Sequence, residues 1–228
     1  MNSNLEKLLI IDFGSQFTQL IGRKLRELNV FSEIIPYQNV SNKTLENYNP
    51  KAVILSGGPS SVVGKKFPLP PSNLFDLGIP VLGICYGLQV MMKLLGGKVD
   101  SGSGTSEFGR AMLKKTGSNS KIINDLFFKG QEQVWMSHGD HVSGLSEDFE
   151  AIASSEGAPF AIVANDNKKL YGVQFHPEVY HTTNGLKLLN NFLLISGFSK
   201  NWSMGSFKEE KINDLKNQIG NKKVICAL

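Results

Sequence analysis

The chain has 228 residues, 41% of them hydrophobic and 19% charged, so it can bury a substantial core and lacks the composition of a disordered protein. It contains no apolar run long enough to span a bilayer, and its N-terminus lacks the layout of a secretory signal, so we expect a cytoplasmic protein without membrane association. The net charge of +4 is modest, and no basic stripe interleaved with aromatic residues indicates a nucleic-acid site.

Short apolar runs alternate with amphipathic stretches in the first half of the chain. Residues 8–12 and 31–35 are typical of strands, and residues 16–28 between them are typical of a helix. Residues 52–56 and 81–85 are continuous apolar runs, as expected of strands buried on both faces. The pattern predicts an α/β fold with an open, mostly parallel sheet and helices on both faces.

The second half has shorter strand candidates, separated by glycine, serine, asparagine and aspartate. They lie at residues 111–114, 133–136, 151–154 and 160–164, and we expect them to add partly antiparallel strands to the sheet. A last strand at residues 170–175 and a helix over residues 184–195 then complete the domain.

The composition changes after Gly197. A polar connector leads to an amphipathic helix near residues 209–219 and to a strand-like VICAL at residues 224–228. A parallel strand without a following partner would be half of a βαβ unit. We therefore predict one domain at residues 1–198 and, at residues 199–228, a linker with the truncated start of another.

The strongest local motif is GICYG at residues 83–87, between an apolar strand and a helical stretch. Glycines two residues to either side of Cys85 give room for the sharp strand-to-helix turn that presents a nucleophile. The positive end of the following helix favours thiolate over thiol. The alternative is an inert core cysteine at a strand end. A disulfide with Cys226, the other cysteine, is not expected, because the two sequence contexts differ.

A second motif, QFHPEV, ends the last predicted strand. In an extended segment His176 and Glu178 project from the same side, so the carboxylate can orient the imidazole. His176 can reach Cys85 if both lie at carboxyl ends of neighbouring parallel strands, where open α/β sheets place their sites. The alternative is a surface histidine before a proline.

A third motif, SGGPSSV at residues 56–62, follows the strand at residues 52–56. Its turn can direct backbone N–H groups at a ligand, and acyl chemistry requires such donors for an oxyanion. We predict an oxyanion hole from the N–H groups of Gly58 and Tyr86. A phosphate-binding loop is the competing interpretation, but no Gly-Lys-Ser/Thr follows. No set of cysteine, histidine and carboxylate residues has zinc spacing, so no metal is expected.

SGGP, GICYG and QFHPE, in this order and spacing, resemble the triad-type (class I) glutamine amidotransferases from residue 8 to residue 197. The resemblance implies a flavodoxin-like fold, with Cys85 as nucleophile, His176 as general base and then acid, and Glu178 as third member of the triad. It also implies a set of residues that hold the substrate L-glutamine: Gly57, Gln89, Ser137, His138, Gly139 and Asp140.

Within this family the chain is most similar to the GMP synthases, through IDFGSQFTQLIGRKLRE, SGGPSSV, WMSHGD and the tail from Asn201. The similarity implies hydrolysis of glutamine to glutamate and ammonia without a cofactor in this chain. It further implies an ATP-pyrophosphatase (synthetase) domain as partner, which would use the ammonia with ATP and Mg²⁺ to convert XMP to GMP. The full-length enzyme could then form a homodimer.

Three other interpretations stay open at this stage. The chain could be an amidotransferase subunit of another pathway, although the tail speaks against that. It could be a γ-glutamyl hydrolase that passes no ammonia onward. It could also be a catalytically silent binding module, against which the presence of Cys85, His176 and Glu178 argues.

Overall fold

The structure is a computed structural model that describes residues 6–102 and 106–225. Within these ranges the strands form a nine-stranded sheet and a separate two-stranded sheet. The strands are β1 (Lys7–Asp12), β2 (Phe31–Pro36), β3 (Ala52–Leu55), β4 (Val81–Ile84), β5 (Lys98–Asp100), β6 (Glu107–Lys115), β7 (Gln131–His138), β8 (His141–Gly144), β9 (Glu150–Ser154), β10 (Ile162–Asn165) and β11 (Leu170–Val173). The α-helices are α1 (Thr18–Glu27), α2 (Asn42–Tyr48), α3 (Tyr86–Leu94), α4 (Gly185–Ile195) and α5 (Met204–Ile219).

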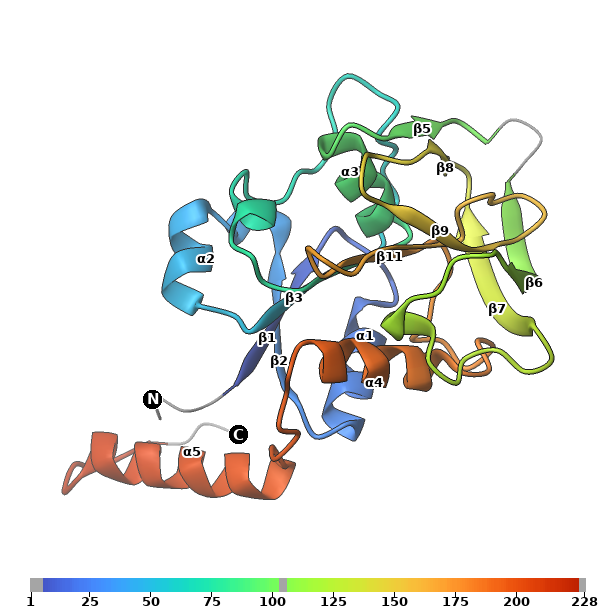
Figure 1. The fold of residues 1–228 in the computed structure, drawn as a ribbon. Coiled ribbons are helices and arrows are strands. Elements are labelled where there is room, and N and C mark those ends of the chain that lie inside the picture. The colour runs from blue at the N-terminus through green and yellow to red at the C-terminus, as the bar shows by residue number, and fades with distance from the viewer. Residues whose placement is uncertain (1–5, 103–105, 226–228) are drawn as a thin grey trace.

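The large sheet has a parallel part and an antiparallel part (Figure 1). Strands β2-β1-β3-β4-β11 pair in parallel in that order, which is the strand order of flavodoxin-like sheets. Strands β10, β9, β6 and β7 continue the sheet by antiparallel pairing, whereas β5 pairs with β8 in the small sheet. The predicted fold class is confirmed, including the added antiparallel strands.

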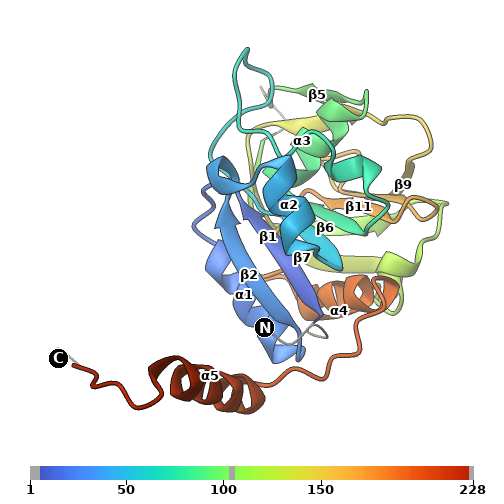
Figure 2. The same cartoon turned by 90° about the vertical axis from the view of Figure 1, so that its left-hand side faces the viewer.

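Helices cover both faces of the parallel strands (Figures 1 and 2). On β1, Leu8 and Ile10 belong to one buried cluster, which includes apolar side chains of α1 and α4. Their neighbours Leu9 and Ile11 belong to a second cluster, with side chains of α2 and α3. The alternation explains why these strands read as continuous apolar runs, because neither face meets water.

Several element boundaries differ from those that the sequence predicts. Strand β11 ends at Val173, two residues before the predicted end, and β6 extends beyond residues 111–114 on both sides. Residues 224 and 225 of the predicted terminal strand are not in a strand, and the rest, with Cys226, lies outside the described residues. Helix α2 and the small sheet were not predicted.

Helix α5 projects from the body of the domain (Figure 2). Its anchor is an aromatic cluster in which the ring centroid of Phe207 lies 5.8 Å from that of Phe31 and 6.1 Å from that of Trp202. The backbone N–H of Trp202 donates to the carbonyl of Asn29, so the connector is fixed to the turn before β2. Among the described residues, we find no helix with the length and hydropathy that crossing a bilayer requires.

Candidate active site

Cys85 lies on the turn between β4 and α3, at the carboxyl end of the parallel strands. Its backbone has φ 52° and ψ −107°, a conformation that L-residues rarely adopt, and its N–H donates to the carbonyl of Val173 on neighbouring β11. A Cβ atom at Gly87 would overlap the carbonyl of Leu55 on β3. The glycine therefore allows α3 to start directly against the sheet, with the sulfur at its N-terminal end.

His176 and Glu178 lie in the loop after β11, and both side chains are buried. The Nδ1 atom of His176 is 2.7 Å from the Oε1 atom of Glu178. We expected the two on an extended segment, and that reason was wrong, because a turn at Pro177 and Glu178 brings them together. Thr182 fixes the histidine further, since its hydroxyl donates to the carbonyl of His176 at 2.7 Å.

The electrostatic environment of His176 favours the charged imidazolium. Burial by itself would lower the pKa of His176, but hydrogen bonds and charge interactions with Cys85 and Glu178 outweigh it and raise the pKa to about 10. A protonated imidazole beside a sulfur stabilises the thiolate. The arrangement thus places a cysteine sulfur and a proton-bearing imidazole within one site.

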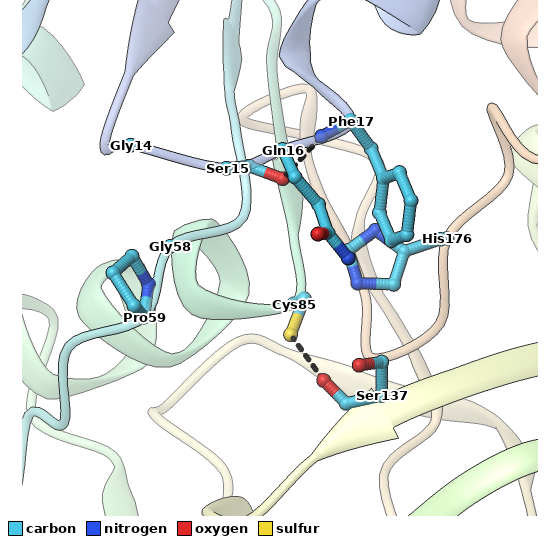
Figure 3. A pocket seen from close by; sticks show the side chains of 9 residues that line it. All are labelled: Gly14, Ser15, Gln16, Phe17, Gly58, Pro59, Cys85, Ser137 and His176. Carbon is cyan, nitrogen blue, oxygen red and sulfur yellow. Dashed lines mark hydrogen bonds between the residues drawn. The ribbon is translucent and has the colours of Figure 1, made fainter.

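Two cavities open onto the sulfur of Cys85. The first has a volume of about 260 Å³, and Figure 3 shows the side chains of Gln16 and Phe17 beside His176 at one side of it. Its lining consists of Gly14, Ser15, Gln16, Phe17, Gly58, Pro59, Cys85, Ser137 and His176. The second has a volume of about 220 Å³ and is lined by Gly58, Pro59, Ser60, Ser61, Cys85, Gln89, Ser137, His138, Gly139 and Asp140.

The second cavity brings together most of the residues expected to hold glutamine. Gln89, on α3, donates from Nε2 to the carbonyl of Asp140 at 2.7 Å and thereby fixes the turn between β7 and β8. Near the end of β7, the carbonyl oxygen of Ser137 lies 3.7 Å from Cys85 Sγ and accepts a hydrogen bond from the sulfur when it is a neutral thiol (Figure 3). Gly57 does not line this cavity. It lies against the imidazole of His176, because a Cβ atom at Gly57 would be 3.1 Å from Cε1 of that residue.

The two residues predicted to form the oxyanion hole flank Cys85 on different elements. Gly58 lines both cavities, in the loop that follows β3. The side chain of Tyr86 is buried, and its hydroxyl donates to the carbonyl of Pro68 at 2.5 Å. The expected contribution of Tyr86 is therefore its backbone N–H at the start of α3.

Glu107, on β6, is a site residue that the sequence did not lead us to predict. Its Oε2 atom lies 3.3 Å from Nε2 of His138 and accepts a hydrogen bond from Ser155 Oγ at 2.6 Å. Burial raises the pKa of Glu107, but these partners and the charge of His138 lower it overall. The carboxylate supports the buried imidazole of His138 from behind the second cavity. No motif indicates it, because the contact depends on the antiparallel pairing of β6 with β7.

Ionisable side chains in the described residues form no group of three or more that is arranged to hold a metal ion.

Phe17 was also not predicted as a site residue, although its ring meets the imidazole of His176 edge-on at a centroid distance of 5.0 Å. It lies at the start of α1, where the sequence shows only a helix boundary.

Comparison with known proteins gives consistent results. Residues 9–196 match the family model described as glutamine amidotransferase class-I. The glutamine-hydrolyzing GMP synthase of Cereibacter sphaeroides is 56% identical over 223 residues, which are 98% of this chain and 43% of that protein. That of Rhizobium etli is 48% identical over 225 residues, with the same shares. The chain thus spans less than half the length of these curated relatives.

Solved structures share the fold. A GMP synthase subunit from Thermoplasma acidophilum superposes with a TM-score of 0.72 at 26% identity, covering 92% of this chain and all of that one. A glutamine amidotransferase from Thermotoga maritima has a TM-score of 0.60 at 21% identity, over 96% of this chain and all of its own, and supports the fold alone. Since the matching family model spans most of the sequence and all three motifs, the chain belongs to the class-I glutamine amidotransferases.

Proposed function

We propose that this chain hydrolyses the side-chain amide of L-glutamine to glutamate and ammonia. The observation that carries the proposal is the meeting of Cys85 with the buried His176–Glu178 pair at one cavity. The residues come from different parts of the sequence, and the carboxyl ends of β4 and β11 bring them together. Membership of the family supports the choice of glutamine as the substrate.

The reaction begins when the Cys85 thiolate attacks the amide carbon of glutamine. The backbone N–H groups of Gly58 and Tyr86 stabilise the oxyanion, and His176 gives its proton to the departing ammonia. A glutamyl thioester remains on Cys85. His176, now neutral, takes a proton from water, which attacks the thioester and releases glutamate. Glu178 holds the imidazole in place and stabilises its charged form throughout.

The two cavities divide the substrate between them in this scheme. The segment from Ser137 to Asp140 and the Gln89 side chain line the second cavity, where they would bind the amino and carboxylate groups of glutamine. His176 lines the first cavity, so the nitrogen that it protonates departs on that side. The carbonyl carbon would then lie between them, at Cys85 and Gly58, which line both.

The ammonia has a specific use in this proposal. The chain would act as the glutaminase part of a GMP synthase, whose synthetase domain converts XMP to GMP with ATP and Mg²⁺. The relatives named for that activity align with 98% of this chain, including residues after the family match, and are more than twice as long. Such an enzyme would work in the cytoplasm and could form a homodimer through its full-length chain. Another amidotransferase pathway is disfavoured by the same alignment.

The proposal is tested by incubating the chain with glutamine or with a γ-glutamyl peptide and measuring glutamate. Release from glutamine, lost in a Cys85→Ala variant, is the expected result. Basal turnover should be low, because glutaminases of this kind depend on coupling to a loaded acceptor site. A glutamine-mimicking electrophile should label Cys85, as mapped on peptides. Hydrolysis of the peptide alone would favour a γ-glutamyl hydrolase and contradict the proposal.

A further inference from the structure

Gln174 is a buried carboxamide in contact with the nucleophile. It follows β11 directly, is fully buried, and its backbone N–H donates to the carbonyl of Ala161. The Nε2 atom of Gln174 lies 3.7 Å from the Sγ atom of Cys85, within hydrogen-bonding distance of sulfur. On its other side, Oε1 accepts a hydrogen bond from Nε2 of Gln89 at 3.4 Å.

The orientation of this carboxamide follows from its neighbours. Gln89 presents an N–H group to Gln174, so the oxygen of Gln174 must face Gln89 and its NH₂ group must face the sulfur. The opposite orientation would place two donors together and direct a carbonyl oxygen at an anionic sulfur. Gln89 is itself held, because its Nε2 atom also donates to the carbonyl of Asp140 at 2.7 Å.

We infer that Gln174 is a positioning residue that donates a hydrogen bond to the Cys85 thiolate and holds it between the two cavities. The inference rests on the proposed function, and it adds a residue that neither the triad nor the oxyanion hole includes. A donor aimed at a charged sulfur stabilises the thiolate more than the neutral thiol, because hydrogen bonds to ionised groups are the stronger ones. Burial keeps water from replacing the carboxamide.

A series of hydrogen bonds therefore links the second cavity, which would hold glutamine, to the sulfur of Cys85. It starts at the Asp140 carbonyl, passes through Gln89 and Gln174, and ends at Cys85 Sγ. Loss of Gln89 would free the Gln174 carboxamide to rotate without removing it from the sulfur. A Gln89→Met change should accordingly weaken the effect of Gln174 only in part.

The competing explanation is that Gln174 only fills space beneath β4 and β11. Two substitutions separate the possibilities. Gln174→Met keeps most of the volume and removes the donor, and Gln174→Leu also removes the donor with a branched side chain of similar size. The matched control is Gln133→Met on β7, because Gln133 also uses its Nε2 atom, at 3.0 Å from the carbonyl of His181.

The test is the alkylation rate of Cys85 by iodoacetamide in the whole 228-residue chain, measured against pH with peptide mapping. Iodoacetamide reports the thiolate without using the glutamine cavity. Both Gln174 variants should move the midpoint of the rate–pH curve upward by about one unit and slow alkylation about tenfold at pH values below the parent's midpoint. Gln133→Met should match the parent chain. Thermal unfolding establishes that each variant is folded, and if Gln174→Met is not, Gln174→Leu decides.

Coincident rate–pH curves for a folded Gln174 variant and the parent would overturn the inference. Glutamate release tests the proposed function separately. If the parent hydrolyses glutamine and the curves coincide, only the positioning role fails. If the curves separate but no glutamate is released from glutamine, the contact with the thiolate stands and the substrate assignment fails.

Discussion

The Nδ1 atom of His176 lies 2.7 Å from the Oε1 atom of Glu178, and both side chains are shielded from water. This contact leaves Nε2 of the imidazole as the nitrogen that can exchange protons at the cavity. It also makes the charge of His176 depend on Glu178, whose carboxylate helps raise the histidine pKa to about 10.

A Glu178→Gln substitution should therefore reduce turnover and change its pH dependence. The native imidazolium keeps its proton until the pH approaches about 10, so the native acid is lost only above that range. Without the carboxylate the pKa of His176 falls, and the alkaline decline in rate begins at lower pH. We expect about 10²-fold lower kcat at neutral pH. The measurement is glutamate release against pH, with Glu27→Gln, at an exposed position of α1, as the control. An unmoved alkaline limb would contradict this role of Glu178.

The raised pKa of His176 also makes the stability of the fold depend on pH. A histidine whose pKa is raised in the folded state stabilises the fold fully below its ordinary pKa, and this contribution disappears as the pH rises through the raised value. The His176–Glu178 pair thus contributes less to stability in alkaline solution.

Glu107→Gln should weaken glutamine binding and reduce stability, through His138. The pKa of Glu107 is lowered, so its contribution is complete above the ordinary value of 4.5 and disappears as the pH falls through the depressed value. We expect the variant to lose about 1–3 kcal/mol at neutral pH, with a smaller difference in acid. Urea unfolding at pH 7 and at pH 4 measures the difference. KM for glutamine should rise more than kcat falls. A kcat effect alone would show that His138 does not shape the glutamine cavity.

Gly58→Ala should lower kcat and also reduce stability. A Cβ atom at Gly58 would lie 2.7 Å from the carbonyl oxygen of Phe13, so the loop must shift and displace the Gly58 N–H. The loss of one oxyanion donor typically costs about 10²- to 10³-fold in rate. Gly117→Ala is the control, since a Cβ there meets no atom within 4 Å. Initial rates of both variants at saturating glutamine test this, and equal rates would exclude Gly58 from the oxyanion hole.

Truncation tests the predicted boundary at residue 198. A chain ending there should still unfold cooperatively, because both buried clusters come from residues before 199. It should nevertheless lose about 1–3 kcal/mol, since Phe31 loses its aromatic neighbours and Glu6 its hydrogen bonds from Ser199. A chain ending at residue 203, which keeps Trp202, should recover most of the loss. Thermal unfolding measures both. A non-cooperative transition for the shorter chain would place the domain boundary further along the sequence.

The parallel part of the sheet and the site at its edge could be predicted from the sequence for one physical reason. Strands buried on both faces must be apolar throughout, and the three motifs stand where such runs end. Cys85 and His176 could therefore be assigned to one edge from the sequence alone. Glu178 was correctly predicted to lie beside His176, but the expected extended backbone was wrong. The alternation of polar and apolar residues does not distinguish a turn from the end of a strand.

Contacts that depend on strand pairing could not be predicted in the same way. Glu107 meets His138 only because β6 and β7 pair antiparallel in a register that places the two opposite each other. Gln174 was visible within QFHPEV, but nothing in the string says that its carboxamide turns inward to sulfur rather than outward to water. Register and side-chain direction are long-range properties that a local pattern does not encode.

The backbone of Cys85 has an unusual thermodynamic consequence. Glycine normally destabilises a fold relative to alanine by roughly 0.5–1 kcal/mol, because it restores freedom to the unfolded chain. At φ 52° and ψ −107° the order should invert, since alanine retains the steric conflict and glycine does not. Cys85→Gly should accordingly resist urea better than Cys85→Ala, by about 1 kcal/mol. Neither variant has a nucleophile, so the comparison measures the conformational cost of the backbone that places the sulfur at the carboxyl end of the sheet.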